Sequence, residues 1–298
     1  MMKFKFFTNA ALIACVLIAS ASCNGNTLPD LSIDPILPSS AQTSPAVTPS
    51  ITEPDSALNF TYTVNGNGVS ITGYIGSSSH VTIPEMINGK SVTIIGYGAF
   101  YDCYNLTTIT IPNQVTSISD EAFAGCSSLT RIIIPGSVTS IGKRVFDRCK
   151  MLSITVDTSN NHYKDIGGVL FTKDGAELIR YPAGIENPSH PEIPPMVFFT
   201  WSIQTKAYTI PDGVTHIDEG AFEGCAVLDK ITIPSSVTNI GAGAFYGCSN
   251  LINIAKLDSV QSIGHSAFWG CSNLTSVVIP YGITNISDHI FRLYPQSR

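Results

Sequence analysis

The sequence predicts a β-rich solenoid, in which similar rungs stack along one axis. Six of the eight cysteines recur at 23-residue intervals in two runs, and each ends the motif Ala-Phe-x-x-Cys or a close variant of it. Each motif leads into Leu-x-x-Ile-x-Ile, whose alternating apolar positions are typical of a strand. A unit of this length cannot bury its own apolar face, so it stacks on copies of itself. The six cysteines are Cys103, Cys126, Cys149, Cys225, Cys248 and Cys271.

Residues 1–23 have the pattern of an export signal rather than a membrane span. Lys3 and Lys5 precede an apolar stretch at 10–19, and small residues follow before Cys23. Small residues before a cysteine resemble the bacterial lipoprotein signal, in which that cysteine becomes the lipidated first residue, although Ser stands where that signal usually has Leu. The alternative is ordinary cleavage after the preceding Ala, which would give a secreted product.

Residues 24–56 are rich in Pro, Ser and Thr and carry no apolar period. Such a segment cannot build a core, so we expect an extended tether. Behind a lipid-anchored cysteine, a tether would hold a folded module away from a membrane.

The repeats occupy 92–156 and 214–298, and the last copy is truncated. Each copy begins with a short strand, Val-Thr-x-Ile-Gly, and continues with Ala-Phe-x-x-Cys, which has helical spacing over about one turn. Stacked copies would give parallel strands around one apolar core. We expect the cysteines to be small core residues, because equivalent positions on neighbouring rungs point the same way and cannot face each other as a disulfide requires.

The pattern Ile-Gly-x-x-Ala-Phe-x-x-Cys-x-x-Leu-x-x-Ile-x-Ile-Pro resembles the BspA-like, or treponemal-type, leucine-rich-repeat proteins of bacterial surfaces. The resemblance covers roughly residues 60–291. It implies leucine-rich repeats with an amino-terminal cap over 57–91. It also implies adhesion to host proteins such as fibronectin or fibrinogen, or to other cells.

The register breaks once, over residues 157–213. Residues 168–181 predict a hairpin that turns at Asp174 and Gly175. The Pro-rich segment 183–205 is expected either to cover the sheet beside the hairpin or to project as a contact surface. Candidate aromatic contacts, in this loop and at a repeat turn where exposure is expected, are Phe198, Phe199, Trp201 and Trp269.

The outward positions of the Leu-x-x-Ile-x-Ile strands form a candidate binding face. Small polar side chains dominate it, and only an Arg and a Lys are charged. They would serve either as a plain solvated sheet face or as a broad, shallow surface for a protein or glycan. The candidate residues are Thr108, Thr110, Arg131, Ile133, Ser153, Thr155, Lys230, Thr232, Asn253 and Ser276.

The sequence contains no phosphate loop, zinc-protease, serine-hydrolase or calcium-loop motif. Its six histidines form no ligand pair with a neighbouring His or Cys, so neither a metal nor a cofactor is expected. With a net charge of −6 and no Lys/Arg run, the chain lacks the basic footprint of a nucleic-acid-binding protein. An enzyme is not expected, although a hydrolase would need only carboxylates that meet in space near 157–213.

Together the signal pattern and the family resemblance imply an exported bacterial protein, lipid-anchored at the outer membrane or cell surface, that binds proteins without catalysis. One alternative is a glycan- or peptide-capturing accessory lipoprotein that binds through the loop around Trp201. Another is an envelope-structural protein without a tight ligand. The truncated last repeat has no polar cap, so pairing through that end stays a hypothesis and the oligomeric state stays open.

Overall fold

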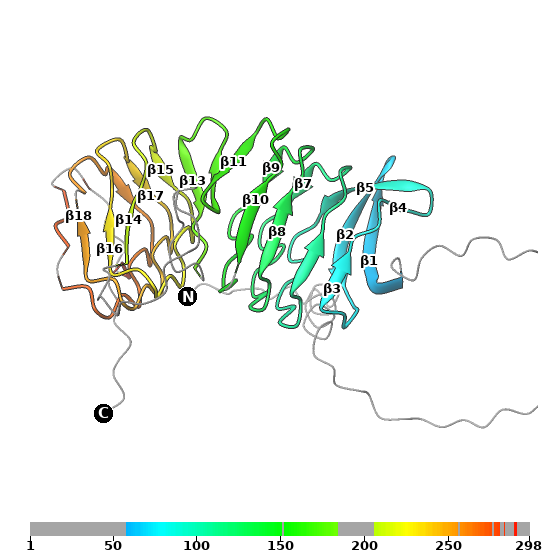
Figure 1. Ribbon diagram of the computed structural model, residues 1–298, viewed down its shortest axis with the longest axis horizontal. Helices are drawn as coiled ribbons and strands as arrows, with labels where there is room; N and C mark the ends of the chain where they lie inside the picture. Colours follow the sequence, from blue (N-terminus) through cyan, green and yellow to red (C-terminus); the bar gives the residue numbers. More distant parts are fainter. Residues whose placement is uncertain are drawn as a thin grey trace, which may run out of the picture.

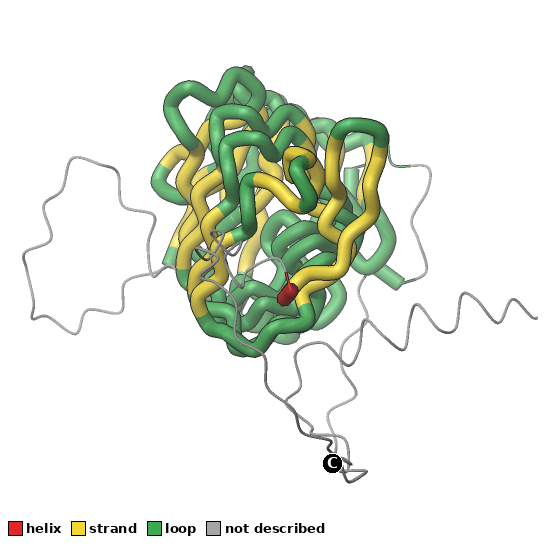
Figure 2. Tube along the Cα trace, turned by 90° about the vertical axis from the view of Figure 1, so that its right-hand side faces the viewer, coloured by secondary structure: helices red, strands yellow, loops and turns green. Residues whose placement is uncertain are grey.

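A computed structural model describes residues 58–150, 152–183, 206–255, 257–275, 277–280, 283 and 289–290. It confirms the predicted β-rich solenoid: Figure 1 shows an elongated stack whose strands run across its long axis. Figure 2 views the stack from one end, with strands on the sides of each coil and loops and turns closing it. In the described part of the chain, no helix is long and apolar enough to cross a membrane.

Four sheets form the walls of the solenoid, two in each half. One sheet of the first half has the order β1 (Phe60–Asn65), β2 (Gly68–Tyr74), β5 (Lys90–Ile95), β7 (Ser117–Ile118) and β9 (Ser140–Ile141), with β4 (Met86–Ile87) beside β5. The other has the order β10 (Ser153–Val156), β8 (Arg131–Ile134), β6 (Thr108–Thr110) and β3 (His80–Thr82).

The second half repeats this arrangement after a hairpin. Its larger sheet has the order β11 (Tyr163–Ile166), β12 (Val169–Thr172), β13 (Glu177–Arg180), β15 (His216–Ile217), β17 (Asn239–Ile240) and β19 (Ser262–Ile263). The smaller has the order β14 (Ala207–Thr209), β16 (Lys230–Thr232) and β18 (Asn253–Ala255). Strands from consecutive repeats pair in parallel, for example Lys230 with Asn253, which is the register that the 23-residue period predicts.

The repeat phenylalanines form a buried column inside each half. Phe123 stacks between Phe100 and Phe146, with ring centroids 5.2 and 6.0 Å apart. In the second half Phe245 stacks between its two counterparts at 5.0 and 5.4 Å. Because each buried ring contributes about 1.5–3 kcal/mol, this column is a main source of stability between rungs.

Five of the six repeat cysteines are free thiols buried beside this column. Cys126 Sγ donates to the carbonyl of Phe100 at 3.1 Å, and Cys248 Sγ donates to that of Phe222 at 3.1 Å. These five therefore have the structural role predicted for them. The sixth, Cys103, is buried as well.

The segments predicted as single helical turns are successive tight turns. Cys126 N donates to Phe123 O at 3.1 Å, and Phe123 N donates to Val145 O of the next rung at 3.0 Å. Left-handed residues interrupt each segment, such as Glu121 with a φ of 56° and Gly125 with a φ of 80°. Because a right-handed helix cannot pass through such residues, the segment stays a turn.

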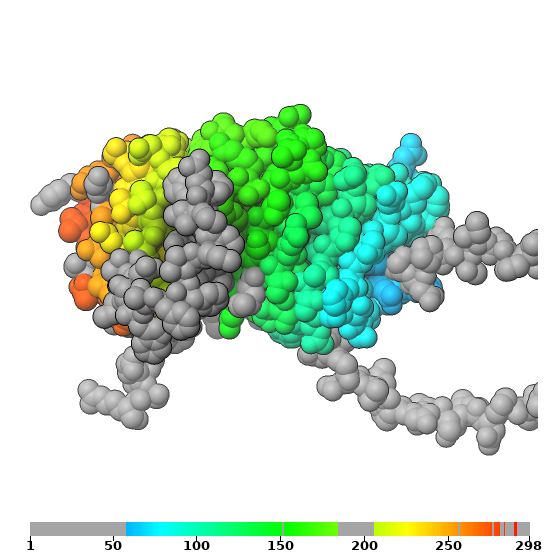
Figure 3. Space-filling view, viewed as in Figure 1, coloured from blue at the N-terminus to red at the C-terminus, as the bar shows by residue number. Residues whose placement is uncertain are grey.

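The register break contains the predicted hairpin. β12 and β13 pair antiparallel, and Gly175 has a φ of 80° in the turn between them. β11 adds a third strand that the sequence did not show. Leu170 on β12 packs into the core of the first half, whereas Phe171 packs into that of the second. The hairpin thus separates two cores, and its green surface lies between the two halves in Figure 3.

Candidate functional site

The predicted binding face exists as outward columns on two different sheets. Thr108, Arg131 and Ser153 lie side by side on β6, β8 and β10. Lys230 and Asn253 are neighbours on β16 and β18. The charged positions of the two columns therefore belong to separate surfaces, one in each half of the solenoid.

All described residues of this face are at least partly accessible to solvent. Ile133, which follows Arg131 on the same face of β8, is 45% exposed, an unusual apolar position in a polar row. Ser276 lies outside the described residues. Thr110, Arg131, Ile133, Lys230 and Asn253 are exposed, and Thr108, Ser153, Thr155 and Thr232 are half-buried.

The aromatic candidates divide into two groups. Phe198, Phe199 and Trp201 lie outside the described residues. Trp269 is half-buried and not exposed as expected, because its ring stacks on Tyr246 at 6.3 Å and on His289 at 6.2 Å. Residues that follow the repeat Phe lie above one another in successive rungs, so a large ring at this position covers its neighbour.

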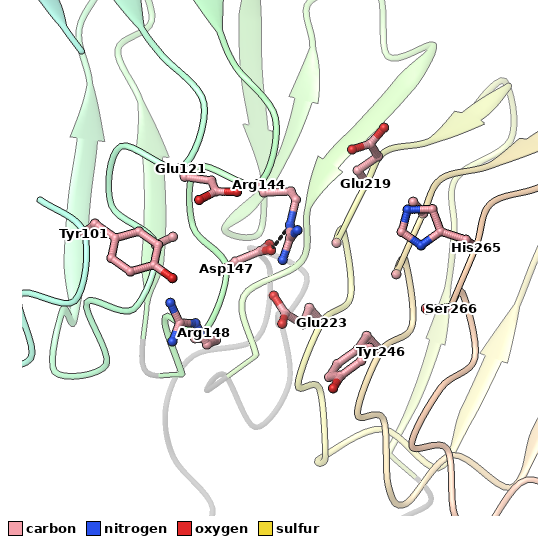
Figure 4. A pocket seen from close by; sticks show the side chains of 14 residues that line it. Tyr101, Glu121, Arg144, Asp147, Arg148, Glu219, Glu223, Tyr246, His265 and Ser266 are labelled. Atoms are coloured by element: carbon pink, nitrogen blue, oxygen red, sulfur yellow. Dashed lines mark hydrogen bonds and ion pairs between the residues drawn. The ribbon is translucent and has the colours of Figure 1, made fainter. Parts of the chain in front are cut away.

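A groove that the sequence analysis did not predict crosses the turns where the two halves meet (Figure 4). We call it the turn groove, and its volume is about 460 Å³. Most of its lining comes from two positions in each rung, the residue before the repeat Ala and the residue after the repeat Phe. Among the lining residues are Tyr101, Glu121, Arg144, Asp147, Glu223 and Tyr246.

Backbone conformation sets these lining positions apart from the rest of the repeat. The residue before the repeat Ala is left-handed in every complete copy, and three copies have Gly there, for example Gly220 and Gly243. Glu121, Arg144 and Ser266 occupy the same position with φ angles of 56°, 55° and 56°. A side chain in this conformation costs about 1–2 kcal/mol, so the repeat alone would favour Gly. Strained non-Gly residues of this kind cluster at functional sites.

The sequence carried a signal for this site that was not used. Three of the six complete copies have Gly at the position before the repeat Ala, whereas the consecutive copies at Glu121 and Arg144 carry charged side chains there. The turn positions vary between copies, and the predicted binding face lies on the strands instead. Only the fold shows that these two departures face Glu223 and Tyr246, about a hundred residues later, across one groove.

Ion pairs hold the charged side chains of the groove in place. Arg144 pairs with Asp147 within its own turn. Arg148 pairs with Asp102 at 3.0 Å, and its guanidinium carbon lies 5.1 Å from the centre of the Tyr101 ring. At the rim, Lys143 of the first half pairs with a glutamate of the second, Glu219, at 2.6 Å.

A buried arginine of the hairpin ties the two halves together beneath the groove. Arg180 and Asp147 are each only 3% exposed, and they pair at 3.7 Å. Arg180 also donates to the carbonyl of Gly220 at 2.6 Å and to that of Glu223 at 3.4 Å. A buried ion pair needs further hydrogen bonds to offset the loss of water, and these carbonyls supply them for the two terminal nitrogens of Arg180.

Two carboxyl groups near the junction of the halves are unusually basic. Burial, followed by the charge of Asp147, raises the pKa of Glu223 to about 7. Burial also raises the pKa of Asp218 to about 6. Glu223 is therefore partly protonated at neutral pH, and its proton can be donated in a hydrogen bond to Asp147.

The hydrolase alternative required carboxylates that meet near residues 157–213, and Asp147 and Glu223 do meet at the hairpin. However, Arg144 and Arg180 both pair with Asp147, so its carboxylate oxygens are already engaged. The groove also lies open across several rungs. This arrangement favours recognition by hydrogen bonds over proton transfer. Among the described residues, no group of three or more His, Cys, Asp or Glu could hold a metal ion.

Solved structures of other bacterial repeat proteins resemble this chain. The pneumococcal vaccine antigen PcpA is 21% identical with a TM-score of 0.57, over 76% of this chain and 75% of that one, and supports the fold. A leucine-rich cell surface protein of Faecalibacterium prausnitzii is 25% identical with a TM-score of 0.46, over 78% and 84%. The leucine-rich repeat protein TpLRR of T. pallidum is 26% identical with a TM-score of 0.40, over 73% and 78%. No curated protein matches the chain.

The repeats also match a family model directly. The model describes the BspA type leucine-rich repeat region, and it matches in six copies over residues 73–186 and 192–295. These ranges span both halves of the solenoid and most of the chain. The chain therefore belongs to the BspA type leucine-rich repeat family.

Proposed function

We propose that this protein is a bacterial surface protein that binds a protein of a host or of another cell and catalyses no reaction. The observation that carries the proposal is the outward column on β6, β8 and β10, where Arg131 and the exposed Ile133 lie together among small polar residues. Protein interfaces are enriched in Arg, and they place a few strong anchors inside a polar surround. Family membership and the export signal support the same proposal.

The shape of this surface favours a large partner. Neighbouring strands lie about 4.8 Å apart, so each rung adds only a narrow strip to the face. A stable interface needs about 800 Å² on each partner, which means contact with several rungs. The proposed ligand is accordingly a folded protein, with affinity spread along β3, β6, β8 and β10.

Binding to immobilised fibronectin, fibrinogen and other matrix proteins tests this proposal, using the chain without residues 1–23. Arg131→Glu combined with Ile133→Asp should weaken saturable binding at least tenfold, since interface anchors typically contribute about 2 kcal/mol or more. Lys230→Glu, on the other sheet, is the matched control and should have a smaller effect. Equal binding by all three proteins would exclude the face around Arg131 as the binding surface.

The proposed location at the surface depends on Cys23. Cells grown with an alkyne-tagged fatty acid should incorporate the tag into this protein, because the thiol after the signal would be acylated. Cys23→Ala should abolish the tag and release the protein into the medium. Cys15→Ala, inside the predicted signal, should keep the tag. An untagged wild-type protein in the medium would favour the secreted alternative.

A further inference from the structure

We propose that the turn groove is a second binding site and that its ligand is a short, uncharged glycan. The site is separate from the proposed protein-binding face, because none of that face's residues lines the groove.

Most charged side chains of the groove are already engaged within the protein. Arg144 pairs with Asp147, Arg148 pairs with a carboxylate at 3.0 Å, and Glu219 pairs with a lysine at 2.6 Å. Glu121 accepts a hydrogen bond from the hydroxyl of Tyr97 at 3.2 Å. A charged ligand would have to break these pairs to gain its own. A neutral ligand can form hydrogen bonds with the remaining donor and acceptor positions of these side chains without breaking the ion pairs.

Those groups offer the hydrogen bonding that sugar hydroxyls need. Carboxylates accept through two oxygens and guanidinium groups donate through up to five N–H bonds, so each can contact neighbouring hydroxyls. Figure 4 shows Glu121, Arg144, Arg148 and Glu223 converging on the groove from both halves of the solenoid. Ion pairs and the fixed turn backbone hold most of them in place before a ligand binds, which lowers the entropic cost of binding.

Two tyrosines provide the apolar contacts of such a site. Tyr101 and Tyr246 lie on opposite sides of the groove (Figure 4), and Tyr101 is 38% exposed. An aromatic ring has an apolar face and a polar hydroxyl, which suits the C–H face and the hydroxyl edge of a sugar. The ring of Tyr246 is itself supported by stacking on Trp269 at 6.3 Å. The volume of about 460 Å³ lies in the range of small-ligand sites, about 300–1,000 Å³.

The test is saturation-transfer NMR and calorimetry with maltotriose, cellotriose, xylotriose and triacetylchitotriose at millimolar concentrations. At least one should bind, and Tyr101→Ala and Glu121→Gly should each weaken that binding at least tenfold. Glu121→Gly is the sharper variant, because it removes the side chain while giving the left-handed backbone the residue that suits it best. Its melting temperature should stay the same or rise, so lost binding cannot be attributed to lost structure.

Two matched controls separate this site from the rest of the molecule. Tyr104→Ala removes a nearby tyrosine of similar exposure, 41%, that does not line the groove. Arg131→Glu alters the proposed protein-binding face. Both variants should leave sugar binding unchanged. If Arg131→Glu loses matrix-protein binding but keeps sugar binding, the two sites are independent. The proposal is overturned if none of the four sugars binds, if all variants bind alike, or if the groove prefers a charged peptide whose binding falls steeply with salt.

Discussion

Glu121 and Arg144 occupy the same turn position in consecutive rungs, with φ angles of 56° and 55°. The backbone penalty of the two residues is therefore the same, but their surroundings differ. Among the described residues, only the exposed Tyr97 donates a side-chain hydrogen bond to the Glu121 carboxylate. The Arg144 guanidinium neutralises Asp147, which is 3% exposed. A pair of identical substitutions can therefore separate backbone strain from electrostatic support.

Glu121→Gly should stabilise the protein by about 1 kcal/mol, since Gly removes the left-handed penalty and an exposed hydrogen bond contributes little. Arg144→Gly should instead destabilise it, because within the described part of the chain Asp147 would keep only Arg180, at 3.7 Å, as a cation partner. Urea unfolding of both variants and of wild type measures the two effects. If both changes act in the same direction, the ion pair at Arg144 is not what offsets the strain there.

Glu223 makes stability depend on pH near neutrality. Burial, and next Asp147, raise the pKa of Glu223 from 4.5 to about 7, while Arg180 and Arg144 act in the opposite direction. The folded protein therefore keeps a proton that the unfolded chain has lost. The resulting stabilisation is complete below pH 4.5 and disappears as the pH rises through about 7. Asp218, whose pKa is raised to about 6 by burial, acts in the same direction at lower pH.

Between pH 6 and pH 8 the free energy of unfolding should fall by on the order of 1 kcal/mol because of Glu223. Glu223→Gln should flatten this dependence, since the amide keeps the shape without the ionisation. Glu219→Gln removes a carboxylate that pairs with the exposed Lys143, and it should leave the slope unchanged. Thermal melting at several pH values checks this, and a wild-type stability that rises from pH 6 to 8 would contradict it.

The cysteine of each complete repeat is buried in the solenoid core. Burial raises the pKa of Cys149 and of Cys225 to about 12. At pH 8 only about one thiol in ten thousand would then be a thiolate, which is the form that reacts with alkylating agents. The native protein should resist iodoacetamide at both positions, and label only after denaturation, as read by peptide mass spectrometry. Rapid labelling of native protein would show that the turns open far more often than their packing implies.

The hairpin shows which structural features the sequence can predict. The Asp174-Gly175 turn between two apolar runs is a local signal, and β12 and β13 pair as it predicted. β11 depends instead on distant contacts: the hydroxyl of Tyr163 accepts a hydrogen bond from Ile141 N at 2.8 Å, one rung earlier. The repeat period likewise predicted the strand register, whereas the turn groove joins residues about a hundred positions apart. Local patterns predict rungs, but they do not show which rungs meet across an insertion.

The described part of the molecule consists of two repeat cores with β12 between them. In a solenoid each rung contacts only its neighbours. A defect in one core can therefore reach the other core only through the hairpin strand β12. Leu170 and Phe171 are adjacent in sequence and both are at most 1% exposed, yet they pack into different cores. Their substitution by Ala should cost about 2–5 and 3–5 kcal/mol respectively.

The two halves should therefore respond differently to substitutions at adjacent residues. In hydrogen-exchange mass spectrometry, Leu170→Ala should speed exchange mainly in peptides from 58–150, and Phe171→Ala mainly in peptides from 206–275. Equal acceleration of both halves by each variant would mean that Arg180 and the ion pairs around it couple the cores into one cooperative unit. Combining Arg180→Met with Leu170→Ala or with Phe171→Ala tests this coupling. The change removes the cation that donates to Gly220 of the second half and pairs with Asp147 of the first. If the coupling runs through Arg180, the double variants should regain a response confined to one half.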